Sequence, residues 1–306
     1  MSVNSTGDWV TWSSRKRISI GLLWLAVVAY WCTGPIVAGN PMAGTGMVFI
    51  AGVFTALVHG VLRYGMKGAL MFALLASVVS LSTENASVLT GLPFGFYHYT
   101  IKAGPLVGVV PGSVALIYIA VGYLSWTVGN LILDRMDERL RGGNIILLPI
   151  VAAFVMVQFD LVQDPATSTY FGMWIWKNAG GFFGVPLSNF LGWYMTAWIF
   201  MQLFTLFLAV GARSRKPQSQ EGLLFWLPPV LMYAGIGVSY IWQYRAVEDR
   251  VLTDLAGHSW HLGDLYETAV IVMLFTMLPS VVIAIAHLIG WTDRGHRTLE
   301  SKGDNP

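Results

Sequence analysis

Long apolar segments separated by short clusters of Lys and Arg constrain this chain more than any other feature of its sequence. The hydrocarbon core of a bilayer is about 30 Å thick, so a helix needs about 20 apolar residues to cross it. Only 11% of the 306 residues are charged, whereas a typical soluble domain has about 25%. The sequence therefore predicts an all-α, polytopic membrane helix bundle. Its eight expected spans are residues 18–36, 44–63, 67–87, 105–133, 144–163, 185–211, 223–244 and 266–291.

The basic residues predict an orientation for these spans. With the N-terminus in the cytoplasm, all but four of the 18 Lys and Arg residues fall in cytoplasmic segments, as the positive-inside rule requires. We therefore expect an integral protein of the cell membrane with both termini in the cytoplasm. The expected parts are an N-terminal segment (1–17), a single transmembrane catalytic bundle (18–291) and a tail (292–306). The four basic residues expected outside are Lys102, Lys177, Arg245 and Arg250.

Two of the expected outer segments, 88–104 and 165–184, are rich in Gly, Pro and aromatic residues and poor in charge. Irregular backbone at membrane depth is tolerated only where protein or a cavity satisfies its polar groups. We therefore expect both segments to fold over the bundle, and the stretch 91–100 to act as a lid. The alternative is an aromatic belt at the membrane interface.

Carboxyl groups inside the expected spans are costly, which makes them candidates for function. At 1.5 Å of rise per residue, Glu84 and Asp160 lie at similar height near the outer end, and Glu267 is placed in the same layer. Asp164 shares a helix face with Asp160. Two carboxyls in a dry site cannot easily both ionise, so one proton is retained for use as a general acid. Alternatively, Asp164 caps a turn before Pro165 and only Asp160 is buried, or Glu84 makes a simple interhelical hydrogen bond.

Other kinds of site receive little support from the sequence. The single cysteine excludes a Cys-based zinc site, and the six histidines are too few for the histidine boxes of a membrane di-iron enzyme. His258 and His261 form a weak HxxH signal, and His59 is expected to bond a neighbouring helix. The net charge of +2 argues against a nucleic-acid partner. We expect no metal and no cofactor, and the sequence does not indicate an oligomeric state.

A buried carboxylic acid among aromatic rings can protonate an alkene. The faces of the rings stabilise the resulting cation by about 2 kcal/mol or more when they are desolvated. The cation then captures water, is attacked by another double bond or loses a proton, which gives hydration, cyclisation or isomerisation. This chemistry suits an isoprenoid that enters from the bilayer.

Three stretches carry a family resemblance: TENASVLTGLPFGFYHYT, GPLVGVVP and FDLVQDPATSTYFGMWIWKNAGGFFGVPLSNFLGW. They resemble the carotenoid biosynthesis membrane-protein family, which includes carotenoid 1,2-hydratases and bisanhydrobacterioruberin hydratases, closely over residues 80–195. The resemblance implies a cofactor-independent hydratase. It would add water to the terminal double bond of an acyclic (ψ) end group and leave a tertiary alcohol. The alternatives are a membrane-embedded terpene cyclase that uses the same acid, or a non-catalytic carotenoid or lipid binding protein.

The acid chemistry, set on the residues that carry the family pattern, suggests roles for individual residues. The proton donor is expected to be Asp160 or Glu84, with Asp164 as its partner. Trp174, Trp176 and Trp193 are expected to line the cation. Asn189, Tyr97 or His98 is expected to hold the water. These expected substrate-binding and water-binding residues are Phe94, Tyr97, His98, Tyr99, Trp174, Trp176, Asn189 and Trp193.

Overall fold

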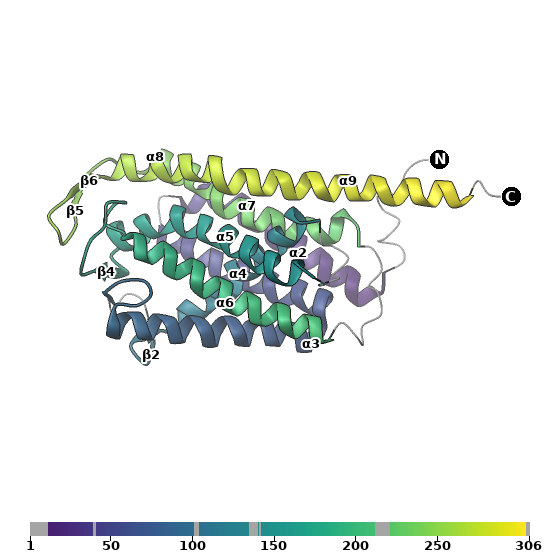
Figure 1. Ribbon diagram of the computed structural model, residues 1–306. Coiled ribbons are helices and arrows are strands. Elements are labelled where there is room, and N and C mark those ends of the chain that lie inside the picture. Colours follow the sequence, from purple (N-terminus) through teal and green to yellow (C-terminus); the bar gives the residue numbers. More distant parts are fainter. Residues whose placement is uncertain are drawn as a thin grey trace.

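The computed structural model describes residues 12–38, 41–100, 104–134, 140, 142–211 and 221–303. Within these residues, seven helical segments are long and apolar enough to cross a membrane. This confirms the predicted all-α polytopic membrane bundle (Figure 1). The α-helices are α2 (Ser14–Val37), α3 (Pro41–Thr90), α4 (Ser113–Ile132), α5 (Asn144–Asp164), α6 (Leu187–Gly211), α7 (Leu223–Ala246), α8 (Leu262–Val272) and α9 (Leu278–Gly303).

Helix α3 consists of two segments that fold back on each other at Gly65. Gly65 has a φ of 72° and a ψ of 170°, which is not a helical conformation. Residues nine apart in a straight helix are separated by roughly 13 Å along the axis. A Cβ atom at Gly60 would nevertheless lie 3.4 Å from that of Ala69. The turn agrees with the separate spans expected at 44–63 and 67–87, although the total of eight crossings stays a prediction.

Three expected boundaries differ from the structure. The span expected at 105–133 begins only at Ser113, because the preceding residues form the hairpin of β2 (Leu106–Val107) and β3 (Val110–Pro111). The chain stays helical past Pro165 because a π-helical segment, η2 (Pro165–Tyr170), follows α5 directly; such widening accommodates a residue that lacks an N–H. Finally, α8 continues through η4 (Met273–Met277) into α9, which extends beyond the expected tail boundary at residue 292.

The short strands lie at one end of the bundle, whereas α2 begins and α9 ends at the other (Figure 1). Strand β1 (Tyr97–Tyr99) pairs antiparallel with β4 (Trp174–Trp176), so that Tyr97 faces Trp176 and Tyr99 faces Trp174. A separate hairpin joins β5 (Val251–Thr253) to β6 (Ser259–His261). The two aromatic segments of the sequence therefore meet each other at the strand end.

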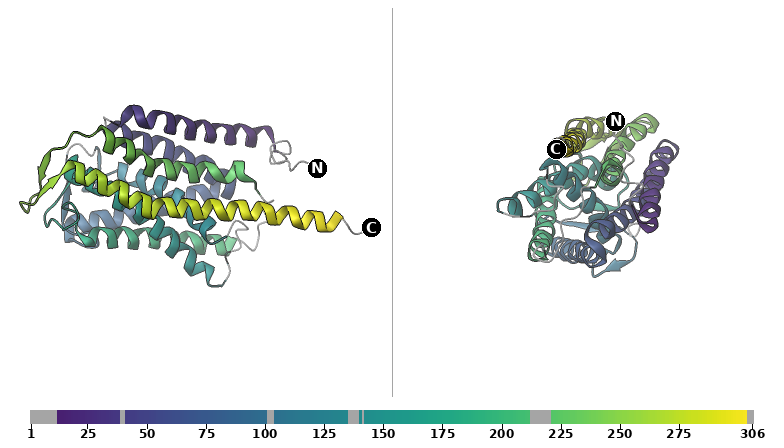
Figure 2. Two further views of the ribbon diagram at one scale, coloured as in Figure 1. Left: turned by 90° about the horizontal axis from the view of Figure 1, so that it is seen from above. Right: turned by 90° about the vertical axis from the view of Figure 1, so that its right-hand side faces the viewer.

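Helix α4 is the most enclosed of the candidate spans, with 78% of its apolar window buried. Small residues let its neighbours approach closely: a Cβ atom at Gly129 would lie 3.0 Å from the Cα of Ala152 on α5. Helix α2 lies at the edge of the bundle (Figure 2), and only 22% of its window is buried. Exposed leucines such as Leu70 and Leu74 on α3 form an apolar outer surface of the kind that lipid covers.

Candidate active site

Glu84 on α3 accepts hydrogen bonds from three tyrosines. The hydroxyls of Tyr97 and Tyr99 both donate to Oε2, the second at 3.0 Å. The Tyr118 hydroxyl, from α4, donates to Oε1 at 3.2 Å. Side chains alternate between the two faces of a strand, so β1 directs Tyr97 and Tyr99 to the same side. Glu84 is only 4% exposed, and its two oxygens are held by groups from two further elements.

The two strand tyrosines are fixed as donors by their surroundings. Burial, followed by the neighbouring Glu84 carboxyl, holds the pKa of Tyr97 well above the usual range of a phenol. The same two causes raise the pKa of Tyr99. Both hydroxyls therefore keep their protons under all ordinary conditions.

Asp160 and Asp164 on α5 form a second acidic group around Asn189 of α6. The Asn189 side-chain amide donates to Oδ2 of Asp160 at 2.9 Å and also to Oδ2 of Asp164. Both aspartates are 0% exposed. Among the described residues, neither Oδ1 atom has a hydrogen-bond partner. The alternative in which Asp164 only caps a turn is therefore wrong, because the chain continues as a π-helix beyond it and buries both carboxyls.

The two acidic groups belong to one cluster. Asp160 and Asp164 each interact electrostatically with Glu84. Tyr99 and Tyr118, which donate to Glu84, also lie within electrostatic range of Asp164 and Asp160 respectively. Helices α3, α4, α5 and α6 and strand β1 thus bring three carboxyls and their polar partners together inside an apolar bundle.

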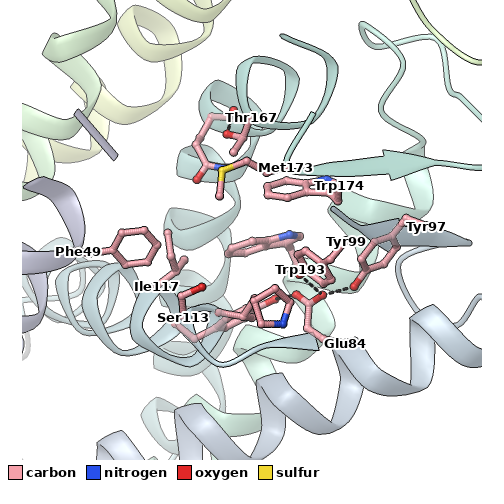
Figure 3. A pocket seen from close by; sticks show the side chains of 14 residues that line it. Phe49, Glu84, Tyr97, Tyr99, Ser113, Ile117, Thr167, Met173, Trp174 and Trp193 are labelled. Atoms are coloured by element: carbon pink, nitrogen blue, oxygen red, sulfur yellow. Dashed lines mark hydrogen bonds between the residues drawn. The ribbon is translucent and has the colours of Figure 1, made fainter. Parts of the chain in front are cut away.

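A cavity of about 60 Å³ lies beside Glu84, which is room for a few water molecules or for the tip of an apolar chain. Glu84, Tyr97 and Tyr99 lie together on one side of it and Phe49 on another, with the indole of Trp193 between them (Figure 3). The remaining lining residues are Pro111, Ser113, Val114, Ile117, Tyr118, Gln163, Thr167, Met173 and Trp174.

Aromatic rings form much of this wall. Tyr118 stacks on Trp193 with ring centroids 4.6 Å apart and ring planes 13° apart. Tyr99 meets Trp174 edge to face at 6.0 Å. A cation inside the cavity would therefore be close to several ring faces and to one carboxyl group.

The structure places five of the predicted site residues on the wall of this cavity: Glu84, Tyr97, Tyr99, Trp174 and Trp193. Asp160, Asp164 and Asn189 belong to the same cluster, although they are not part of the wall. Instead, Gln163 and Thr167 from the same helical run reach it.

Other predicted residues lie elsewhere. His98 is exposed, because strand alternation turns it away from its two tyrosine neighbours, so its expected contact with water at the site is wrong. Phe94 is buried against Gly192, where an added Cβ atom would lie 2.5 Å from the ring. Trp176 packs against Tyr97 at 4.9 Å. Glu267, expected in the acidic layer, is exposed.

Several wall residues were not predicted from the sequence, and Tyr118 is the most informative of them. It is a hydroxyl-bearing residue within the apolar run of α4 and is 0% exposed. An isolated polar group inside an expected span is a signal of the same kind as Glu84. Phe49 and Gln163 gave no comparable signal, because their position on the wall follows from helix packing alone.

His59, His258 and His261 bond to groups outside the acidic cluster. His59 bonds Tyr123 of α4 at 2.6 Å and the Phe225 carbonyl of α7 at 3.1 Å, which confirms its expected interhelical role. His258 and His261 contact different aspartates, Asp254 and Asp249. The described part of the chain contains no group of three or more His, Cys, Asp or Glu residues that could hold a metal ion.

The fold and the site define a class: an integral membrane helix bundle with a buried, aromatic-lined acidic site. Residues 44–248 match the family described as carotenoid biosynthesis protein, and the chain belongs to this family. The bisanhydrobacterioruberin hydratase of Haloarcula japonica is 27% identical to it over 244 residues, which cover 78% of this chain and 81% of that protein. No solved structure matches the chain. The protein is therefore a carotenoid-modifying enzyme of the membrane.

Proposed function

We propose that this protein is a carotenoid hydratase that adds water to the terminal double bond of an acyclic (ψ) end group. The observation that carries the proposal is the position of Glu84, which three phenols hold on the wall of an aromatic cavity inside the bundle. The name of the Haloarcula relative supports hydration as the reaction. The carotenoid substrate reaches the cavity from the lipid bilayer.

In the first step, Glu84 donates a proton to the less substituted carbon of the terminal double bond. It is the donor because, of the three clustered carboxyls, it is the one on the cavity wall. The π bond breaks, a C–H bond forms and the neighbouring carbon becomes a tertiary cation. The ring faces of Trp193 and Tyr118 stabilise this charge, as does the Glu84 carboxylate that remains.

In the second step, water attacks the cation and forms the C–O bond. The Asp160–Asp164 pair takes up the proton that the water loses, and Asn189 holds the pair in place. The proton then returns to Glu84 through Tyr99 or Tyr118, which lie within electrostatic range of the pair and donate to Glu84. One alkene and one water give one tertiary alcohol, so the reaction needs no oxidant or reductant.

We also propose eight membrane crossings, with the strand end facing away from the cytoplasm. The basic cluster Arg15, Lys16 and Arg17, which is expected inside, lies at the start of α2, at the opposite end. There Lys16 pairs with Glu221 at 2.5 Å. This arrangement follows the positive-inside rule and places the site close to the outer water layer.

Expression in cells that accumulate a lycopene-type carotenoid tests the reaction. The pigment masses are read in ordinary and in oxygen-18 water. A hydratase adds one or two waters that carry the label, whereas a cyclase leaves the mass unchanged with a new retention time. Unaltered pigments that still co-purify with the protein would instead indicate a carotenoid binder. Glu84→Gln should abolish the product, and Glu221→Gln is the matched control because it removes a carboxylate at the far end of the bundle.

A further inference from the structure

Two further cavities lie between the active-site cavity and the charged loop that follows α7. A cavity of about 30 Å³ shares Gln163, Thr167 and Ile117 with the first. A third cavity, of about 370 Å³, shares Gln243 with the second. The three cavities therefore adjoin one another, with Gln163 among the residues that line the first two and Gln243 lining the second and the third.

Polar groups accompany this path through an otherwise apolar region. Gln243 and Ser239 are one helical turn apart on α7 and both line the second cavity. Their side chains are 3.5 Å apart, with Gln243 Nε2 as donor. Gln163 is only 7% exposed, and within the described chain no hydrogen bond of its side-chain amide is found; the contact from Thr167 is to its backbone carbonyl. A buried amide with unused donors and acceptors is a site for ordered water.

The third cavity has a charged rim. Glu248, Asp249 and Arg250 line it together with Tyr170. The guanidinium of Arg250 lies 4.8 Å from the centre of the Tyr170 ring. Asp249 accepts a hydrogen bond from the Gly263 amide at 2.9 Å, and this bond, followed by the contact with His261, lowers the pKa of Asp249. Charged groups of this kind keep the rim hydrated.

We propose that these cavities form a water passage from the rim at Asp249, past Gln243 and Ser239, to Gln163 beside the acid cluster. The inference rests on the proposed hydration, because that reaction consumes water in a buried cavity inside an apolar helix bundle. Phe49 and Val114 line the side available to the polyene. Water arriving past Gln163 reaches the cation from the α5 side, which also carries the Asp160–Asp164 pair that takes up its proton. Separate entries let an apolar substrate and water meet at one carbon atom.

Thiol labelling tests the passage without any assay of activity. Cys32 is exposed, so the variants are built on Cys32→Ser. Ser239→Cys should react with a small, charged, water-soluble methanethiosulfonate added to the strand side. Met232→Cys, on the same helix, fully buried and outside the three cavities, should not. Adding Gln243→Leu removes the polar amide that lines both the second and the third cavity. The labelling of Ser239→Cys should then slow by about tenfold or more, which corresponds to a barrier higher by roughly 1.4 kcal/mol. Equal labelling of Ser239→Cys and Met232→Cys would overturn the passage, whatever the protein's activity.

A second measurement asks whether the passage supplies the reacting water. In heavy water, a cation that is not captured loses a proton again, and the recovered polyene gains deuterium. Gln243→Leu should lower the ratio of alcohol to deuterated polyene by about tenfold. Gln243→Asn, which retains an amide, should keep the ratio. Trp242→Leu is the control, because Trp242 is adjacent in sequence and exposed, and it should also keep the ratio. An unchanged ratio in Gln243→Leu would overturn the role in catalysis. Normal labelling of Ser239→Cys, together with a wild type that forms neither product, counts against the hydration itself.

Discussion

Replacing Asn189 by Leu removes the side-chain amide that donates to both buried aspartates. The amide makes two hydrogen bonds, one to Asp160 at 2.9 Å and one to Asp164. A hydrogen bond to a charged group contributes about 1.5–3 kcal/mol, so the pair loses about 3–6 kcal/mol of stabilisation. If this loss appears in the transition state, the rate falls by roughly 10²-fold to 10⁴-fold.

The assay is alcohol formation from a ψ-end carotenoid in membranes that contain equal amounts of each variant. Gln202→Leu is the matched control, because Gln202 also lies on α6 and also bonds α5, through the Ile145 carbonyl at 3.0 Å. That bond is to a neutral group and contributes only about 0.5–1.5 kcal/mol to stability. Should Asn189→Leu retain the activity of Gln202→Leu, the aspartate pair has no part in catalysis.

Three further predictions concern the tyrosines and the lid. Tyr118→Phe keeps the stack on Trp193 but removes a donor to Glu84, so turnover should fall by about tenfold to a hundredfold with little change in stability; an unchanged turnover would exclude the phenol from the mechanism. Gly192→Ala should reduce the free energy of unfolding by about 1–3 kcal/mol, because the new methyl group meets the Phe94 ring, and thermal unfolding in detergent that matches the wild type would contradict this. Because the pKa values of Tyr97 and Tyr99 are raised in the folded protein, the unfolded chain loses these phenol protons above about pH 10 while the folded chain keeps them. The free energy of unfolding should therefore decline as the pH rises beyond that value. The decline should be less steep in the double variant Tyr97→Phe, Tyr99→Phe.

The sequence was sufficient to predict the helix bundle and the acidic candidates. Runs of apolar residues determine the spans, and a carboxyl such as Glu84 or Asp160 is conspicuous inside such a run because its burial is costly. The expected start of a membrane helix at residue 105 was wrong, because residues 105–112 form a short apolar hairpin whose composition is the same as that of the start of a membrane helix. There Gly108 adopts a φ of 67°, a turn conformation that hydropathy does not reveal.

The partners of the acidic residues could not be predicted in the same way. Tyr97, His98 and Tyr99 are adjacent in sequence, and only the pairing of β1 with β4 establishes that His98 points away from Glu84. A strand of three residues is too short to show a periodic pattern. Likewise, Asn189 of α6 bonds both Asp160 and Asp164 of α5, a contact that arises from the packing of the two helices and not from spacing in the sequence.

Deuterium incorporation into the product tests the central claim most directly. In the proposed reaction, the Glu84 carboxyl exchanges its proton with solvent and transfers it to carbon. Alcohol formed in heavy water should therefore carry one carbon-bound deuterium beside each new tertiary alcohol, and Glu84→Gln should form no alcohol. Alcohol without carbon-bound deuterium, or undiminished formation by Glu84→Gln, would contradict protonation of the double bond by this residue.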